Sequence, residues 1–529
     1  MIDLLQTEFG AITDLIRLHA AQEPTRRALV EGQRVLTYAE LDATMDRVAS
    51  ALQRDGLKPG DAIAICANMS IEYAAVFLGA LRAGVVVAPL APGSTQTSLA
   101  RMMADAGAQL VFTDAACAGL VVPPVASGAD QRTASTASTT TRIACIALDD
   151  SSAARALTGW LGVPGQRPEP VAVQPEWPFN IIYSSGTTGE PKGIVQSHGM
   201  RWTHVRRGST YSYGPDTVTL LSTPLYSNTT LVVFLPTLAF GGTAVLMPKF
   251  DAQAYLVLAQ THRATHTMLV PVQYQRLMAR PDFAAHDLSS FRFKFSTSAP
   301  FTAAVKADVL KRWPGGLVEF YGMTEGGGSC ILEAHLHPTK LHTVGRPAEG
   351  HDIRLIDDRL QEVAPGEAGE VVGHSPGMMT GYHRQPGKTR EAEWFDASGK
   401  RFIRTGDVGR FDADGFLTLF DRKKDMIISG GFNVYPSDLE AVLREHPAVL
   451  EVAVVGVPSE QWGETPVAFV VMQPGQTADV AGLLQWVNQR VGKTQRVTAL
   501  RVVQELPRSA IGKVLKRELR EQYTALAAP

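Results

Sequence analysis

The most informative stretch of the sequence is Tyr183-Ser184-Ser185-Gly186-Thr187-Thr188-Gly189-Glu190-Pro191-Lys192-Gly193. It brings hydroxyl groups, glycines and one lysine into a single short loop. Backbone N–H groups exposed beside glycine, hydroxyl donors and a mobile cation can together surround a polyphosphate. A Walker A loop needs Gly-Lys followed by Ser or Thr, whereas Lys192 is followed by Gly193. The stretch therefore predicts a phosphate-binding loop of another kind, with a plain surface loop as the alternative.

Four further segments follow this loop in a fixed order. They read Tyr321-Gly322-Met323-Thr324-Glu325, Thr405-Gly406-Asp407, Asp421-Arg422-Lys423-Lys424-Asp425 running into Ser429-Gly430-Gly431, and Pro507-Arg508-Ser509-Ala510-Ile511-Gly512-Lys513. Together the five segments resemble the adenylate-forming superfamily of acyl-CoA synthetases, carrier-loading adenylation domains and luciferases. The resemblance covers nearly the whole chain, from residues 36–41 near its start to Lys513 near its end.

The resemblance implies an α/β fold in two parts. A large N-terminal adenylate-forming domain of layered α/β subdomains, residues 1–421, would hold ATP and the acyl group. A small mobile α+β domain, residues 425–529, would follow a hinge at Lys424. The length of 529 residues agrees with this division, because single cores stop growing at roughly 250–300 residues.

Composition narrows the class of partner. The net charge of -2 provides no global basic field, which argues against nucleic acid and favours a small-molecule substrate. Cys66, Cys117, Cys145 and Cys330 lack C-x-x-C spacing, so we expect reduced thiols rather than a zinc site or a disulfide framework. Monomer and homodimer both stay open.

The sequence carries no sign of a targeting or membrane-spanning segment. Asp3 and Glu8 stand where a signal peptide would have basic and apolar regions, which predicts a cytoplasmic protein. Residues 217–248 lack charged side chains and are long enough to cross a bilayer. Prolines and a Gly-Gly pair interrupt this run, so it predicts a buried helix over residues 231–240 and a core strand over 243–246, without membrane insertion.

The N-terminal half predicts alternating helices and strands. Thr37 and Glu40 form a capping box, and apolar residues then repeat at helical spacing. Short apolar runs at residues 85–87, 110–112 and 143–147 predict parallel strands. Residues 132–142 consist almost wholly of Ala, Ser and Thr, which predicts a surface loop.

The C-terminal part predicts a smaller set of elements. Residues 412–415 are turn-forming and precede a strand over 416–420, and the charged cluster 421–425 then marks the domain boundary. Ser437 and Glu440 form a second capping box. The remaining expected elements are strands over 452–455 and 467–472, a helix over 480–491, a strand over 500–503 and a helix after Val514.

The chemistry implied by the resemblance is the making of a thioester from a free acid. This reaction is uphill unless a carboxylate oxygen becomes a good leaving group, and ATP can supply that. The implied activity is that of an acyl-CoA synthetase, an AMP-forming acid–thiol ligase that uses ATP, Mg²⁺ and coenzyme A and releases pyrophosphate. The protein must neutralise charge on the phosphates with preorganised donors.

By resemblance, Thr187, Thr188 and Lys192 hold the departing phosphates, Thr324 faces the α-phosphate, and Asp407 with its cationic partner Arg422 binds ribose. The implied ATP site comprises Ser184, Ser185, Gly186, Thr187, Thr188, Gly189, Lys192, Ser298, Ala299, Pro300, Glu319, Phe320, Tyr321, Gly322, Thr324, Asp407 and Arg422.

The implied catalytic residues are Lys513, Thr324 and Glu325, with Glu325 also holding Mg²⁺, a cation that prefers oxygen ligands. Lys513 resembles the mobile lysine that bridges the carboxylate and the α-phosphate. Two unit charges about 4 Å apart are worth roughly 4 kcal/mol at an effective dielectric near 20. After rotation about Lys424, the residues Gly430, Gly431 and Phe432 would line a tunnel for the thiol of CoA.

The acyl pocket implied by resemblance comprises Tyr226, Ser227, Asn228, Gly322, Met323 and Gly327. Many relatives carry a histidine where this chain has Ser227, so that histidine's role does not transfer. Ser227 and Asn228 either bind a polar acid or cap the following helix. Gly326, Gly327 and Gly328 would leave space in the pocket wall. No acidic residue lies between Thr217 and Pro248, which favours a non-amino acid because a buried ammonium needs a partner.

Other readings stay open. A carrier-loading adenylation enzyme would use a different thiol, a luciferase-like oxygenase carries the same motifs, and a non-catalytic nucleotide binder would lack Lys513 or Glu325, which are present. His335, His337 and His342 lie in a loop without accompanying carboxylates or cysteines, so we expect no metal site there.

Overall fold

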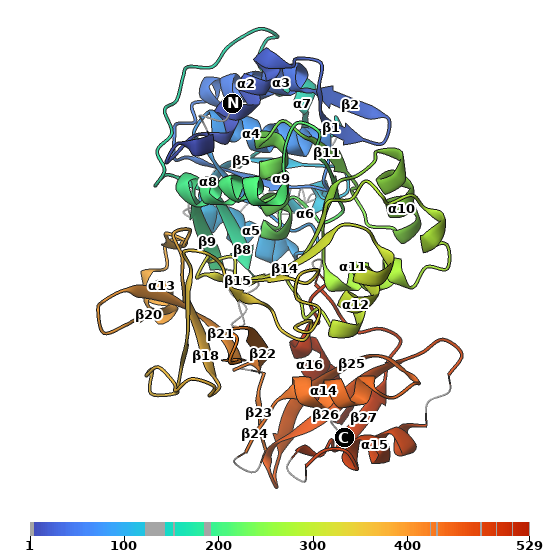
Figure 1. Cartoon of the computed structure of the whole chain (residues 1–529). Helices are drawn as coiled ribbons and strands as arrows, with labels where there is room; N and C mark the ends of the chain where they lie inside the picture. Colours follow the sequence, from blue (N-terminus) through green and yellow to red (C-terminus); the bar gives the residue numbers. More distant parts are fainter. Residues whose placement is uncertain are drawn as a thin grey trace, which may run out of the picture.

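The computed structural model describes residues 5–121, 143–151, 154–184, 192–423, 425–429, 432–476, 479–492, 495–509 and 512–527. Figure 1 shows a large N-terminal part above a smaller unit, coloured orange to red, that begins at strand β23 (Ile427–Ser429). This division matches the predicted fold class, a large α/β part followed by a small α+β part.

The first sheet of the large part has nine strands. Its order is β16 (Arg346–Pro347), β15 (Ser329–Glu333), β14 (Gly316–Gly322), β13 (Phe293–Ser296), β12 (His266–Leu269), β10 (Val218–Leu221), β11 (Thr243–Leu246), β1 (Arg27–Glu31) and β2 (Arg34–Thr37). The pairs from β1 to β14 are parallel, and the flanking pairs β1–β2, β14–β15 and β15–β16 are antiparallel. A parallel centre places several strand ends, and the loops after them, at one edge of the sheet.

The second sheet has eight strands. Its order is β19 (Gly381–Tyr382), β9 (Lys192–Ser197), β8 (Pro178–Ser184), β4 (Val86–Pro89), β3 (Ala62–Cys66), β5 (Ala108–Thr113), β6 (Ala144–Ala147) and β7 (Arg155–Ala156). The strands expected at residues 85–87, 110–112 and 143–147 are confirmed as β4, β5 and β6, with β4 and β6 beginning one residue later than expected. All three run parallel to their neighbours.

Helices cover and join these two sheets. Those of the large part are α2 (Ile12–Gln22), α3 (Tyr38–Arg54), α4 (Ile71–Arg82), α5 (Gln96–Ala106), α6 (Ala118–Val121), α7 (Leu157–Trp160), α8 (His198–Arg206), α9 (Asn228–Ala239), α10 (Ala252–Thr261), α11 (Pro271–Met278), α12 (Ala303–Arg312) and α13 (Pro386–Glu391), with the 3-10 turns η1 (Arg207–Tyr211) and η2 (Phe283–Ala285). Helix α4 contacts β1 of the first sheet and β3 and β4 of the second. One apolar core therefore spans both sheets through the helices between them.

Two helices of this core correspond to predicted ones. Thr37 accepts from the backbone N–H of Glu40, whose carboxylate accepts from Thr37 in return, so the capping box of α3 is confirmed. The expected helix over 231–240 is α9, which begins three residues earlier at Asn228, and the expected strand over 243–246 is β11. The predicted loop over 132–142 lies almost wholly outside the described residues.

A third sheet joins the large part to the C-terminal unit. Its strands are β17 (Asp352–Ile356), β18 (Gly369–His374), β21 (Arg401–Phe411) and β20 (Glu393–Phe395), with β22 (Leu417–Arg422) paired to β21. The expected strand over 416–420 is β22. Its last residues enter the charged cluster that we predict to hold the hinge, and Lys424 itself lies outside the described residues.

The C-terminal unit is a five-stranded sheet with helices on both faces. Its elements are β23, β24 (Phe432–Val434), α14 (Pro436–Arg444), β25 (Val449–Ser459), β26 (Gly463–Met472), α15 (Val480–Asn488), β27 (Ala499–Val502) and α16 (Lys516–Ala527). Helices α14 and α15 share one apolar cluster with β25 and β26, whereas α16 packs into another cluster on the same strands. The expected strands and helices of this unit are confirmed.

The predicted capping box at the start of α14 is wrong. The helix begins at Pro436 with Tyr435 as its N-cap, so Ser437 lies inside the first turn. Proline suits this first position because its missing N–H has no partner there in any case and its φ is already helical. Glu440 instead accepts from the backbone N–H of Val454 at 2.9 Å and pairs with Lys516 Nζ at 3.0 Å.

No helix in the described part of the chain is long and apolar enough to span a bilayer.

Candidate active site

The site forms at the edge where the parallel strands β12, β13 and β14 end. Residue Leu269 ends β12, Ser296 ends β13 and Gly322 ends β14, and these three strands are paired side by side in parallel. The segments that follow them contain two predicted groups of site residues, 298–300 and 323–325. Ligands of open α/β sheets bind outside this carboxyl edge, so the topology brings both groups to a suitable place.

Ser298 has a backbone conformation that supports a specialised role. Its φ is 80°, in a region that residues other than glycine rarely adopt. Its hydroxyl lies 2.7 Å from the hydroxyl of Thr229, in the first turn of α9. Strain of this kind costs on the order of 1–3 kcal/mol and clusters at functional sites. Ala299 is half-buried and Pro300 exposed at the same edge.

The predicted ribose-binding residues lie together. Tyr321 donates its hydroxyl to Asp407 Oδ2 at 2.9 Å, and Asp407 Oδ1 lies 3.3 Å from Nε of Arg422. Asp407 and Arg422 face each other in the β21–β22 ladder, while Tyr321 comes from β14. Burial, and then the charge of Asp407, raise the pKa of Tyr321 well above its usual value, so its hydroxyl stays a donor. This group holds a carboxylate, a cation and a phenol at the joint of two sheets.

A tyrosine that the sequence analysis missed links two other predicted residues. Tyr382 donates its hydroxyl to Glu325 Oε1 at 2.9 Å, and Lys192 Nζ lies 5.0 Å from the centroid of the Tyr382 ring. The ring is 8% exposed, and burial followed by the charge of Glu325 raises its pKa. The predicted phosphate-binding lysine and the predicted Mg²⁺-holding carboxylate thus share one neighbour.

The predicted phosphate loop is described only at its two ends. Ser184 pairs with Lys192 in the antiparallel β8–β9 ladder, which closes the hairpin around the loop. The predicted residues Ser185, Gly186, Thr187, Thr188 and Gly189 lie outside the described residues.

Glu319 lies within β14 and is paired with Lys306. Its carboxylate forms an ion pair with Lys306 of α12, and both side chains are buried. Lys306 Nζ also donates to the carbonyl oxygens of Leu341 at 2.8 Å and Thr343 at 3.0 Å. Burial raises the pKa of Glu319, and Lys306 opposes that rise. Phe320, the next residue, packs partly buried against the main core.

The loop that carries Lys513 lies against the large part of the chain. Gly512 has φ 76°, and a Cβ atom on it would come within 2.9 Å of Val272 Cγ1 and 3.3 Å of Val270 Cγ2. These valines stand directly after β12 and at the start of α11. Arg508 donates to the Gly512 carbonyl at 2.7 Å and to Glu451 at 2.9 Å, which holds the loop on the C-terminal sheet. Gly512, the neighbour of Lys513, therefore packs against the segment that directly follows β12.

Asp421 makes the contacts that join the two sides of the predicted hinge. Its Oδ2 accepts from the backbone N–H of Ser437 at 3.1 Å and lies 3.6 Å from Lys516 Nζ. Burial raises the pKa of Asp421, with Lys516 opposing the rise. Of the predicted tunnel residues, Gly430 and Gly431 lie outside the described residues, and Phe432 begins β24.

The region predicted to bind the acyl group begins with a helix cap. Ser227 is the N-cap of α9 and accepts from the backbone N–H of Thr229 at 3.3 Å, so the capping alternative is confirmed for this residue. Tyr226 is half-buried, and burial raises its pKa to about 12. Met323 packs partly buried beside Met379.

A buried arginine fixes the orientation of Asn228. Arg201 of α8 is fully buried and donates to Oδ1 of Asn228 at 2.7 Å and to Oδ1 of Asn180 at 3.0 and 2.9 Å, and it also contacts Oε1 of Gln196. Because arginine carries only donors, the atom of Asn228 that faces it is the oxygen. Gln196 in turn donates to the carbonyl of Thr324 at 2.7 Å. This network ties the predicted acyl pocket to the predicted catalytic turn.

The acceptors of Arg201 within the described part of the chain are amide oxygens rather than carboxylates. Burial lowers its pKa to about 9. Amide oxygens thus accept most of the hydrogen bonds of a buried charge. The sequence did not signal this arrangement, because Asn180, Gln196 and Asn228 come from three separate elements.

The three glycines after Glu325 serve close packing in this structure. A Cβ atom on Gly326 would come within 2.1 Å of the Gly377 carbonyl, and one on Gly328 within 2.4 Å of the Ile353 side chain. A Cβ atom on Gly327 would meet Ile403 at 2.7 Å. The space expected for substrate beside these glycines is filled by neighbouring chain segments. Gly322 is exposed at the end of β14, and its assignment and that of Gly327 to the acyl pocket stay predictions.

Known proteins resemble this chain over nearly its whole length. A family model described as AMP-binding enzyme matches residues 16–383, and one described as AMP-binding enzyme C-terminal domain matches residues 438–513. The indoleacetate–CoA ligase of Aromatoleum aromaticum is 32% identical over 96% of this chain and 98% of its own. The feruloyl-CoA synthase of an Amycolatopsis species is 33% identical over 95% and 97%.

A solved structure agrees in fold as well. ATP-bound MatB from Rhodopseudomonas palustris superposes with a TM-score of 0.84 at 28% identity, covering 98% of this chain and 100% of that chain. The resemblance and the fold class predicted from the five motifs are both confirmed. The chain belongs to the AMP-binding enzyme family, in which it carries both the main and the C-terminal domain.

Proposed function

We propose that this protein is an AMP-forming acyl-CoA synthetase that activates a non-amino carboxylic acid with ATP and transfers the acyl group to coenzyme A. The observation that supports the proposal is that the Lys513 loop packs on the segment after β12, beside β13 and β14, whose ends lead to Ser298 and Thr324. These residues come from separate parts of the chain, and a binder of nucleotide alone would not need the lysine.

The reaction has two steps. An oxygen of the acid attacks the α-phosphorus of ATP, the bond to the β-phosphate oxygen breaks, and pyrophosphate leaves. The thiol sulfur of CoA, after losing its proton, then attacks the acyl carbon, and AMP leaves. Lys513 offsets the growing negative charge in the first step, which is the usual way in which a positioned cation accelerates such a transfer.

The chain's own residues would divide the binding of ATP among them. Asp407 accepts hydrogen bonds from ribose hydroxyls, and Arg422 orients that carboxylate. Lys192 offsets charge on the β- and γ-phosphates, together with the hydroxyls of the 185–191 loop.

Glu325 fits a role in holding Mg²⁺, since carboxylate oxygen is the ligand type that this cation prefers. Tyr382 donates to Oε1 of Glu325, and we assign the other oxygen, Oε2, to the ion. When bound, Mg²⁺ supplies charge neutralisation at the phosphates.

The class of acid is inferred from the pocket region and from relatives. Both curated relatives described above are named for aromatic acids. The sequence from Thr217 to Pro248 contains no acidic residue to receive an ammonium group. We therefore expect a small to medium non-amino acid, aliphatic or aromatic. The cytoplasmic location suggested by the N-terminal sequence stays a prediction.

The experiment is ATP-dependent consumption of CoA thiol across fatty, hydroxy, aryl, dicarboxylic and amino acids. A clear best rate with a small or medium non-amino acid is expected. A best rate with an α-amino acid or with a C16 fatty acid would contradict the substrate class, and no CoA consumption with any acid would contradict the function.

A further inference from the structure

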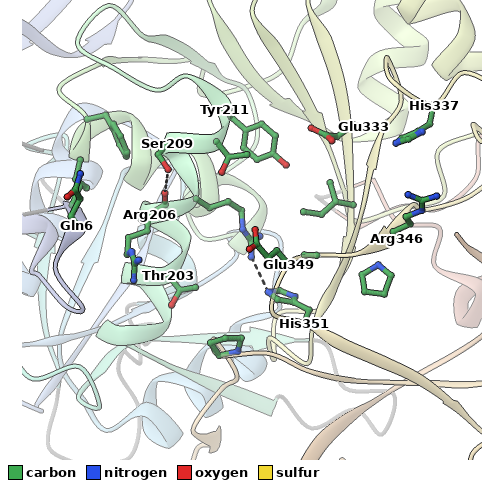
Figure 2. A pocket seen from close by; sticks show the side chains of 18 of the residues that line it. Gln6, Thr203, Arg206, Ser209, Tyr211, Glu333, His337, Arg346, Glu349 and His351 are labelled. Carbon is green, nitrogen blue, oxygen red and sulfur yellow. Dashed lines mark hydrogen bonds between the residues drawn. The ribbon is translucent and has the colours of Figure 1, made fainter. Parts of the chain in front are cut away.

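A cavity of about 940 Å³ opens between the end of α8 with η1 on one side and β15 with β16 on the other. Figure 2 shows its labelled lining residues, which include Arg206, Tyr211, Glu333, Arg346 and His351. Arg207, at the start of η1, lines it as well. Basic side chains thus outnumber acidic ones around this cavity.

Two hydrogen-bond donors meet in the cavity without an acceptor between them. The backbone N–H of Ser329 donates to Nδ1 of His351 at 2.9 Å, so the neutral imidazole carries its proton on Nε2. That Nε2 lies 3.5 Å from the Nη2 atom of Arg207, as the dashed line in Figure 2 marks. Because arginine also only donates, this contact is not a satisfied hydrogen bond.

The charge of Arg207 has no carboxylate partner in the described part of the chain. Its guanidinium forms no ion pair there, although Glu333 and Glu349 line the same cavity. Burial lowers the pKa of Arg207, and burial with the neighbouring charge of Arg207 lowers the pKa of His351 to about 4. At neutral pH, His351 is therefore a neutral donor and Arg207 a half-buried cation, and an anionic oxygen would satisfy both.

Two series of contacts connect residues of this cavity with the predicted acyl pocket. Ser329, which holds His351, faces Gly322 in the β14–β15 ladder. Along α8, Arg201 contacts Asn228 and lies 3.5 Å from Nδ1 of His204, and both Arg207 and His351 lie close enough to His204 to lower its pKa. Arg201 therefore links Asn228 to His204, which lies one helical turn before Arg207.

We propose that Arg207 and His351 bind a second anionic oxygen group, such as a carboxylate, at the end of the acid substrate remote from the carboxylate that is activated. The proposal rests on the proposed function and names its substrate class more closely, as acids that carry two anionic groups. The competing role of Arg207 is structural, since a cation near the C-terminus of α8 interacts favourably with the helix dipole.

The test compares kcat/KM for acyl-CoA formation with matched acids that do or do not carry a terminal carboxylate, over several chain lengths. Arg207→Gln keeps an N–H donor on a shorter side chain and removes the charge. We expect it to lower kcat/KM for the best two-carboxylate acid by about ten- to a hundredfold, and for its one-carboxylate analogue by less than about threefold. His351→Asn keeps an acceptor for Ser329 N–H, removes the Nε2 donor and should act in the same direction.

Arg206→Gln is the matched control, because it removes the same charge from the adjacent residue. Arg206 is exposed, and its side chain turns away from His351 in Figure 2. This variant should leave the preference between the two acids unchanged within about twofold. Thermal unfolding of each variant checks its fold, and His351→Asn keeps the test decisive if Arg207→Gln does not fold.

The outcomes separate the two proposals. Wild-type activity with one-carboxylate acids, together with an equal loss on both acids in Arg207→Gln, would overturn the anion site and leave the function standing. If Arg206→Gln lowered the preference for the two-carboxylate acid as much as Arg207→Gln, the cause would be the general electrostatic potential of the cavity. The assignment of the anion site to Arg207 would then be wrong. If millimolar inorganic phosphate changed the rate of acyl-CoA formation with every acid alike, the cavity would bind an effector. That result would also overturn the proposed binding of the substrate's second anionic group. Absence of acyl-CoA formation with any acid would overturn the proposed function itself.

Discussion

Tyr382 shows how single residues connect parts of the site that the sequence motifs present separately. Its hydroxyl binds Glu325, which lies 57 residues away in the chain, and its ring faces Lys192. It lies on β19, a two-residue edge strand that belongs to none of the five motifs. We infer that Tyr382 is a positioning residue that holds one carboxylate oxygen of Glu325.

Tyr382→Phe should therefore raise the Mg²⁺ concentration needed for half-maximal adenylation by about tenfold, since a hydrogen bond to a charged group contributes roughly 1.5–3 kcal/mol. The measurement is pyrophosphate release against Mg²⁺ concentration. The KM for the acid should change little. A loss of activity that saturating Mg²⁺ does not restore would show that the hydroxyl acts elsewhere.

Lys513 is predicted to act in the first half-reaction alone. Lys513→Ala should slow adenylate formation by two or more orders of magnitude while leaving the conversion of a supplied acyl-adenylate to thioester largely intact. The two half-reactions are measured separately, as pyrophosphate release and as thioester formation. Arg517→Ala, on the exposed face of α16, is the matched control for loss of a basic residue. Equal losses in both steps would contradict the role of Lys513.

Among the elements, strand β14 ends at predicted site residues, and its Glu319 forms a buried ion pair with Lys306 of α12. Removing one partner of such a pair leaves an uncompensated charge, at a cost of about 3–5 kcal/mol. Lys306→Met should thus lower the free energy of unfolding at pH 8 by about that amount, measured by urea denaturation. The double variant Lys306→Met with Glu319→Leu should recover most of the loss, and failure to recover it would point to lost carbonyl contacts of Lys306 instead.

The pH dependence of Lys306→Met follows from Glu319. Burial already raises the pKa of Glu319, and loss of Lys306 removes the interaction that opposes this rise. The folded variant then retains a proton that the unfolded chain has released. Its stability should therefore fall as pH rises above the usual carboxyl value of 4.5 toward the raised pKa of the folded state, so the variant is less impaired at pH 5 than at pH 8.

Local sequence signals predicted elements well where the deciding interaction is itself local. The Thr37 and Glu40 pair forms its box within one helical turn, and the strand over 243–246 is bounded by glycine and proline. Ser437 and Glu440 have the same spacing as the first pair, but α14 begins at Pro436. Glu440 forms an ion pair with Lys516, which is distant in the sequence. At this position tertiary contacts override the local sequence preference for a capping box, as they often do.

Local sequence signals likewise did not predict the distant contacts within the candidate site. Gln196 reaches the carbonyl of Thr324 across 128 residues, and Arg207 meets His351 across 144. Motifs predicted which segments carry the chemistry, because those residues recur together at fixed spacing. They did not predict the neighbours that orient those residues, since these come from other strands and helices and follow no spacing rule.

At the scale of the whole molecule, the C-terminal unit lies with the Lys513 loop against the large part. We predict that thioester formation requires rotation about Lys424. Lys424→Pro should fix φ there and slow thioester formation at least tenfold while sparing adenylation, and Gly431→Leu should act alike by narrowing the thiol path. Lys424→Ala, which leaves φ free, is the control. A matching fall in single-turnover pyrophosphate release would refute the hinge and tunnel roles.

The most direct test of the central claim is the product stoichiometry of the wild-type protein with its best acid, ATP and excess coenzyme A. We predict that one AMP and one acyl-CoA appear for each ATP consumed, and that omitting the acid abolishes both. Formation of ADP, or of AMP without acyl-CoA at saturating coenzyme A, would contradict an acyl-CoA synthetase and favour another acceptor for the adenylate.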